Sequence, residues 1–93
     1  MTIAFNTLRN RWMAEPEFRE SYDRISPEME IAFAIAEARG RAQLSQAQLA
    51  EKVGTTQAMV NRWERGTSRP TTKSLERVAK ATNSRLHVEL LPA

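Results

Sequence analysis

The sequence contains no cysteine, only three glycines and a single histidine among its 93 residues. The absence of cysteine excludes a disulfide framework and a thiolate metal site. No apolar run approaches the roughly 18–20 residues that a membrane span requires. The first residues, MTIAFNTLRNRW, also lack the uninterrupted apolar stretch of a secretory signal. We therefore expect a cytoplasmic protein without a membrane segment.

The groups that enzymes use are sparse as well. The sequence has no glycine-rich phosphate loop, no metal-ligand cluster, and no nucleophile accompanied by a plausible base. The single histidine, His87, has no second histidine near it, so a solvated side chain is its expected role. The sequence thus predicts no enzymatic activity, no metal and no cofactor.

Charge is divided unevenly along the chain, whose formal net charge is +3. Residues 1–39 hold five arginines against seven acidic residues, a net charge of −2. Residues 40–93 hold nine basic residues against four glutamates, a net charge of +5. A basic region favours a polyanionic partner, whereas an acidic region favours a basic one. We therefore expect two different partners.

Four helices are expected between residues 26 and 84, because each stretch opens with a capping side chain. The expected caps are Ser26, Ser45, Thr56, and Thr71 or Thr72. The helices should end near Gly40, Gly54, Gly66 and Asn83. Their inward apolar residues follow the helical period and are Ile31, Ala34, Ile35, Ala38, Leu49, Ala50, Val53, Val60, Trp63, Leu75, Val78 and Ala79. This pattern predicts a mainly α-helical bundle of four to five helices.

Residues 1–25 are expected to form a helical extension ahead of this domain. Its apolar residues at helical spacing are Phe5, Leu8, Trp12, Phe18 and Tyr22. Such short helices are not stable alone in water, so they must pack on something. They either cover the protein's own core or anchor a partner protein.

Residues 85–93, RLHVELLPA, alternate in polarity, with Leu86, Val88 and Leu90 facing one way. This pattern predicts a short C-terminal strand. A lone strand exposes unpaired backbone groups, so it needs a partner. Pairing with its copy in a twofold homodimer is the first expectation, and addition to a partner's sheet is the second.

Residues 46–65 have the pattern of two helices joined by a tight turn. The small side chain of Ala50 suits the point where the helices approach most closely, and Gly54 permits the positive φ that the turn needs. Two helices joined by a short turn that contains glycine form a helix-turn-helix.

The outward face of the second helix, within GTTQAMVNRWERG at residues 54–66, carries amides and guanidiniums but no carboxylate. Glutamine and arginine can bond to base edges, and small apolar groups can touch the thymine methyl group. The expected base contacts are Thr56, Gln57, Ala58 and Arg62. The expected phosphate contacts are Ser45, Gln46, Arg65, Ser68 and Arg69.

At these residues, LSQAQLAEKVGTTQ and the following ERG resemble the Xre/Cro-type helix-turn-helix of lambdoid phage repressors. The resemblance covers about residues 28–84 and implies a lambda-repressor-like fold with the base contacts named above. It also implies a structural ion pair between Arg39 and Glu64 beneath the second helix. Met59 and Asn61 depart from the commonest patterns, so the operator sequence does not transfer.

A second resemblance concerns the flanks. EPEFRESYDRISPEMEIAFAIAEAR before the domain and RLHVELLPA behind it are similar to HigA-like antitoxins. This resemblance implies a protein that represses its own operon and neutralises a small basic RelE/ParE-like (HigB-like) ribonuclease toxin. The acidic N-terminal half agrees with a basic partner. The alternatives are a stand-alone Xre-type repressor without a toxin, and a protein-interaction module that does not bind DNA.

Overall fold

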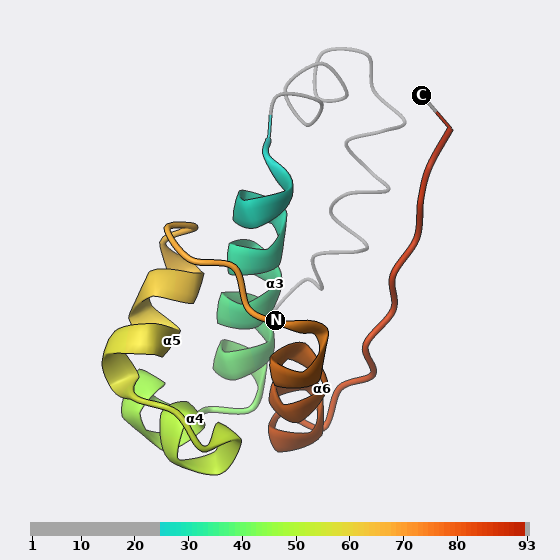
Figure 1. Ribbon diagram of the computed structural model, residues 1–93. Coiled ribbons are helices and arrows are strands. Elements are labelled where there is room, and N and C mark those ends of the chain that lie inside the picture. Colours follow the sequence, from blue (N-terminus) through green and yellow to red (C-terminus); the bar gives the residue numbers. More distant parts are fainter. Residues whose placement is uncertain (1–24, 93) are drawn as a thin grey trace.

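The computed structural model describes residues 25–92, which form four helices (Figure 1). They are α3 (Pro27–Arg41), α4 (Gln46–Val53), α5 (Gln57–Glu64) and α6 (Thr72–Ala81). The predicted mainly helical fold is therefore confirmed. The expected helical extension, with Phe5, Leu8, Trp12, Phe18 and Tyr22, lies outside the described residues. Within residues 25–92, no helix has the length and apolar character to cross a membrane.

Each helix begins at a residue that the sequence marks as a cap. The hydroxyl of Ser26 accepts the backbone N–H of Met29 at 3.2 Å, and the hydroxyl of Thr71 accepts that of Ser74 at 3.0 Å. These bonds satisfy N–H groups that the first helical turn leaves without a partner. Since each bond spans three residues, the local sequence is sufficient to predict it.

Helix α3 differs from the prediction in its end and in its buried face. Gly40 lies inside the helix, which continues to Arg41. Ala32 is fully buried beside Ile35, whereas Ala34 is exposed. Because Ala32 and Ala34 have the same side chain, the sequence pattern does not indicate which of the two is buried. The direction from which α5 packs against α3 decides which alanine is covered.

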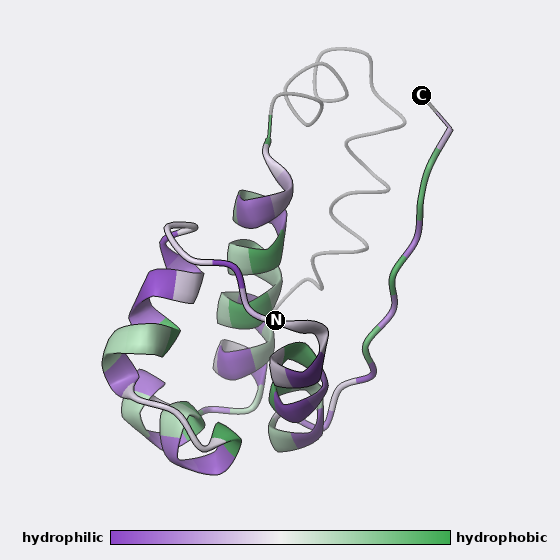
Figure 2. Ribbon diagram, in the orientation of Figure 1, coloured by the Kyte–Doolittle hydropathy of each residue, from purple (hydrophilic) through white to green (hydrophobic). Residues whose placement is uncertain are grey.

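The core lies where the four helices meet. Its buried residues are Ile35, Leu49, Ala50, Val53, Val60, Trp63 and Val78. Hydrophilic residues cover much of α5 and α6 (Figure 2). Helix α5 buries only Val60 and Trp63, and α6 buries only Val78. Short helices of this kind depend on packing for their stability, so the position of α5 is set by its neighbours α3 and α4.

Residues 84–92 are extended, but they form no strand within the part of the chain that the structure describes. The strand expected over residues 85–93 is thus absent from the single chain. A strand exists only with a backbone partner, and none of the described segments provides one. The start of the segment is fixed, because Arg41 Nη2 donates to Ser84 Oγ at 2.8 Å. From there it rises on the side of α3 that is remote from α5 (Figure 1).

Candidate nucleic-acid interface

The turn between α4 and α5 is built from the residues that the sequence indicates. Gly54 has φ +84° and ends α4, with its N–H donating to the carbonyl of Ala50 at 2.9 Å. The N–H of Thr55 donates to the same carbonyl at 2.9 Å. Thr56 then caps α5 by accepting the N–H of Met59 at 3.1 Å. A left-handed residue followed directly by a cap lets the chain change direction within three residues.

The side chains named from the sequence as base contacts all lie in the open. Thr56, Gln57, Ala58 and Arg62 are exposed, whereas Val60 is fully buried and Trp63 is 4% exposed. Helix α5 therefore has an apolar side fixed in the core and a polar side available to a partner. No acidic side chain lies in its first turn, where the helix dipole attracts anions.

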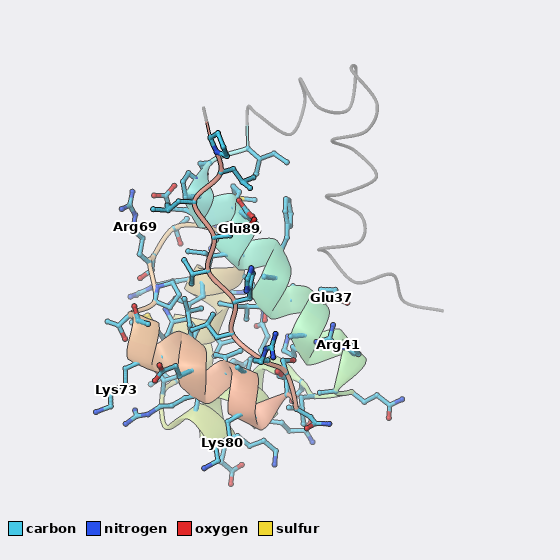
Figure 3. The ribbon with its side chains drawn as sticks, turned by 90° about the vertical axis from the view of Figure 1, so that its right-hand side faces the viewer. Glu37, Arg41, Arg69, Lys73, Lys80 and Glu89 are labelled. Carbon is cyan, nitrogen blue, oxygen red and sulfur yellow. The ribbon has the colours of Figure 1, made fainter. Side chains whose placement is uncertain are left out.

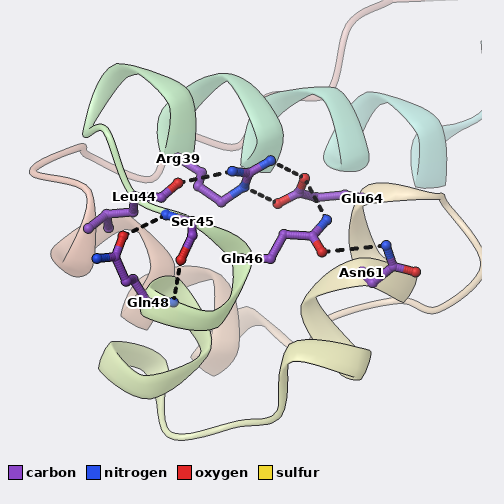
Figure 4. Close-up of polar contacts among 7 residues, drawn as sticks. All are labelled: Arg39, Leu44, Ser45, Gln46, Gln48, Asn61 and Glu64. Atoms are coloured by element: carbon purple, nitrogen blue, oxygen red, sulfur yellow. Dashed lines mark hydrogen bonds and ion pairs between the residues drawn. The ribbon is translucent and has the colours of Figure 1, made fainter.

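The one acid of α5, Glu64, is bound from beneath by Arg39 of α3 (Figure 4). Arg39 Nε donates to Oε2 at 2.7 Å and Nη2 donates to Oε1 at 2.9 Å, while Nη1 reaches the carbonyl of Leu44 at 2.9 Å. The Glu64 side chain is only 7% exposed. The hydrogen bond to Glu64, together with its charge, raises the pKa of Arg39 above its usual value. The pair thus fixes the end of α5 to α3 and neutralises the only carboxylate on that helix.

The same carboxylate organises two amides that the sequence did not connect. Gln46 Nε2 donates to Glu64 Oε1 at 3.3 Å, and Asn61 Nδ2 donates to Gln46 Oε1 at 3.5 Å (Figure 4). Gln46 begins α4 and Asn61 lies in α5, so the chain of bonds links the two helices of the motif. Sequence reasoning assigned Gln46 to phosphate and gave Asn61 no role. These contacts depend on how closely α4 and α5 approach each other, and no local sequence pattern indicates them.

The hydroxyl of Ser45 already serves as the cap of α4. It accepts the N–H of Gln48 at 3.0 Å, and the Gln48 side-chain oxygen accepts the N–H of Ser45 at 2.8 Å (Figure 4). This reciprocal capping box leaves the hydroxyl proton of Ser45 for an external acceptor. Arg65, which follows α5, is exposed.

The loop after α5 brings Arg69 against the start of α3. Arg69 Nη2 forms an ion pair with Glu28 Oε1, although the Arg69 side chain is 78% exposed. The pKa of Glu28 lies below its ordinary value, first because of a hydrogen bond from its own backbone N–H, and then because of Arg69 and the Ser26 hydroxyl. Ser68, also expected at phosphate, is half-buried with its hydroxyl 3.8 Å from Met59 Sδ. The predicted phosphate contacts therefore lie around α5, but the charge of Arg69 is partly offset by Glu28.

Two helices joined by a glycine turn, with an exposed polar side on the second, define a helix-turn-helix domain. Residues 35–88 match the helix-turn-helix family, and the chain belongs to this family. It is also 36% identical over 64 residues to the plasmid copy control protein CopR of Streptococcus agalactiae, covering 69% of this chain and 70% of that protein. No solved structure matches the chain. The Xre-type resemblance is thereby confirmed and points to a DNA-binding regulator, whereas the HigA-like resemblance stays a hypothesis.

Proposed function

We propose that this regulator is a repressor that inserts α5 into the major groove of its operator. The observation that carries the proposal is the acid-free exposed side of α5, whose single carboxylate is held below it by Arg39. Gln57 and Arg62 would bond to base edges, and Thr56 and Ala58 would contact thymine methyl groups. A recognition helix in this family of motifs enters the groove by its N-terminal residues, which are the exposed ones here.

Around α5, the proposed phosphate contacts are Ser45, Gln46, Arg65, Ser68 and Arg69. The Ser45 hydroxyl proton and the free N–H groups at the start of α4 suit an anion. Gln46 is held by Glu64 and Asn61, so its amide would approach the backbone in a fixed orientation. Arg69 would exchange its bond with Glu28 for one with phosphate.

The repressor is proposed to act as a homodimer, because one eight-residue helix reaches too few base pairs for operator specificity. Twofold symmetry then requires a palindromic operator whose half-sites lie about 34–36 Å apart, or a multiple of that distance. DNase I footprinting of the DNA upstream of the gene tests this proposal. Two protected half-sites related by a dyad are expected, and uniform, salt-sensitive coating without a footprint would overturn it.

The finer proposal is that the protein is also the antitoxin of a type II pair. Its support is the acidic first half of the sequence, with a net charge of −2 over residues 1–39, together with the aromatic residues of the extension. In this proposal Phe5, Leu8, Trp12, Phe18 and Tyr22 anchor a small basic RelE/ParE-like toxin.

Co-expression with the product of an adjacent reading frame tests the antitoxin role. That product should arrest growth alone and be silenced by this protein, and Trp12→Ala combined with Phe18→Ala should abolish the rescue. Gln57→Ala is the matched control, because it should impair DNA reading and leave the rescue intact. A harmless neighbour, or rescue by the double variant, would contradict this proposal.

The second candidate is a stand-alone repressor without a toxin partner. Similarity to a plasmid copy control protein favours it. In that case the regulated promoter would control replication, and deletion of the gene would change the copy number of the replicon that carries it. An unchanged copy number, with a toxic neighbour present, would favour the antitoxin.

A further inference from the structure

Three of the four large apolar side chains that are exposed among the described residues lie in the segment after α6. Val88 is 73% exposed, Leu90 is 95% exposed and Leu91 is 48% exposed. All three lie in extended backbone that has no strand partner among the described residues. Extended apolar segments with unsatisfied backbone groups are templates for pairing with another chain.

This segment already has the two faces of a strand. His87 Nε2 lies 3.6 Å from Glu89 Oε2, so these two side chains share one face. Alternation places Leu86, Val88 and Leu90 on the other face. Leu86 is half-buried at a groove between α3 and α6, whereas Val88 and Leu90 continue past that groove into solvent.

The groove is lined by apolar side chains of both helices. Ala34 and Ala38 of α3 line one wall, and Leu75 and Val78 of α6 line the other. Ala34 is exposed although it lies among these apolar neighbours. In Figure 3 the segment crosses in front of α3, from near Arg41 to Glu89 and beyond. An apolar surface beside Leu86 would therefore extend the core.

We propose that a second copy of this chain supplies that surface, through antiparallel pairing of residues 85–91 about a twofold axis at Val88. In this register Leu86 faces Leu90 of the second copy, and Val88 faces its own counterpart. On the other face, His87 of each copy lies opposite Glu89 of the other. Within residues 86–90, apolar pairs thus occupy one face of the ribbon and complementary polar pairs the other, while at the ends Arg85 lies opposite Leu91 of the second copy.

Neighbouring registers match less well. If the twofold axis lay between Val88 and a neighbouring residue, Val88 would face a polar side chain of the second copy. This follows because polar and apolar residues alternate along the segment. An axis at Glu89 sets two carboxylates directly opposite each other, which is destabilising. An axis at His87 leaves Leu90 opposite Ser84, which is bound to Arg41. The register centred on Val88 places the most leucine and valine side chains opposite one another and also sets His87 opposite Glu89.

Pairing in this way leaves α5 available, because the segment and α5 lie on opposite sides of α3 (Figure 1). The second copy also brings Leu90 to the mouth of the α3/α6 groove beside Leu86. The interface specifies the homodimer on which the proposed operator binding rests, but its existence can be measured without DNA.

The lack of native cysteine allows a direct test with single-cysteine variants of the full chain at positions 87, 88 and 89. Only a residue on the twofold axis faces its own copy, so Val88→Cys should form a disulfide-linked dimer about tenfold faster than His87→Cys or Glu89→Cys. In sedimentation, the unmodified chain should be a dimer and Val88→Lys should be a monomer. Circular dichroism should show that Val88→Lys keeps its helices.

Fastest cross-linking at position 87 or 89 would overturn the register. A monomeric unmodified chain, or a dimer unaffected by Val88→Lys, would overturn the interface. If the chain were a monomer and residues 85–91 became protected from hydrogen exchange only when another protein was added, the segment would bind that protein and not a second copy. If the dimer cross-linked at position 88 gave no DNA footprint, the proposed repressor function would be wrong, but the proposed dimer interface would still hold.

Discussion

The guanidinium of Arg39 bonds both carboxylate oxygens of Glu64, at 2.7 and 2.9 Å, across 25 residues of sequence. The bond joins the last turn of α3, the longest described helix, to the last residue of α5. It fixes the end of α5, the proposed recognition helix, to α3, while Val60 and Trp63 hold the helix in the core. The Glu64 carboxylate therefore adds to the core packing that orients α5.

Replacing that carboxylate should be costly. Glu64→Gln leaves the partly buried Arg39 without its charge partner and should lower the free energy of unfolding by about 1–3 kcal/mol. Glu37→Gln is the control, because it breaks the more exposed pair between Glu37 and Arg41 in α3 and should cost about 0.3–0.5 kcal/mol. Urea unfolding measures both. Equal losses would show that the Arg39–Glu64 pair does not brace the fold.

Glycine substitutions separate backbone strain from helix propensity. Gly54→Ala should destabilise the domain by about 1–2 kcal/mol, because φ is +84° there and a side chain disfavours it. Gly66→Ala should cost a similar amount, since φ is +73° and the nearby Met29 Sδ belongs to a flexible side chain that can move aside. Gly40→Ala lies in α3 with open space around it and should instead stabilise by about 0.5–1 kcal/mol. Thermal unfolding would contradict this account if the three variants shifted the midpoint in the same direction.

Glu28 should limit the contribution of Arg69 to DNA binding. Glu28→Gln removes the ion pair, so Arg69 becomes available to phosphate and binding to random DNA should tighten. The slope of log K against log salt should become steeper by about one unit. Glu76→Gln, the same change of charge at an exposed position on α6, is the control. Identical anisotropy titrations for the two variants would mean that Arg69 does not act at phosphate.

The lowered pKa of Glu28 also predicts an acid dependence of stability. A carboxyl whose pKa is depressed by folding stabilises the folded state above its unfolded pKa, and this contribution disappears as the pH falls through the folded pKa. The stability difference between the unmodified chain and Glu28→Gln should therefore be present at neutral pH and vanish in acid. A difference that persists at the lowest pH where both variants fold would contradict the assignment.

The sequence was sufficient for features that depend on local contacts. Ser45, Thr56 and Thr71 cap helices through bonds that span three residues, and Gly54 takes the backbone conformation that only glycine adopts easily. The exposed side of α5 followed from helical periodicity, since Trp63 is buried.

Apart from the Arg39–Glu64 pair, which the Xre-type resemblance implied, the contacts between distant segments were not predicted. Arg69 lies 41 positions from Glu28, and nothing in the spacing indicates that the loop after α5 returns to the start of α3. The bond between Gln46 and Asn61 depends on how closely two helices cross. The C-terminal strand was wrongly predicted for another reason, because pairing needs two segments and residues 25–92 of one chain supply only one.

The most direct test of DNA reading compares Gln57→Ala with the unmodified chain on the operator and on random DNA. Gln57 is exposed at the first position of α5, so its removal should leave folding intact. If its amide reads a base, the variant should lose about 1–3 kcal/mol on the operator and almost nothing on random DNA. An equal loss on both DNAs, or no loss on either, would contradict the assignment of α5 as the recognition helix.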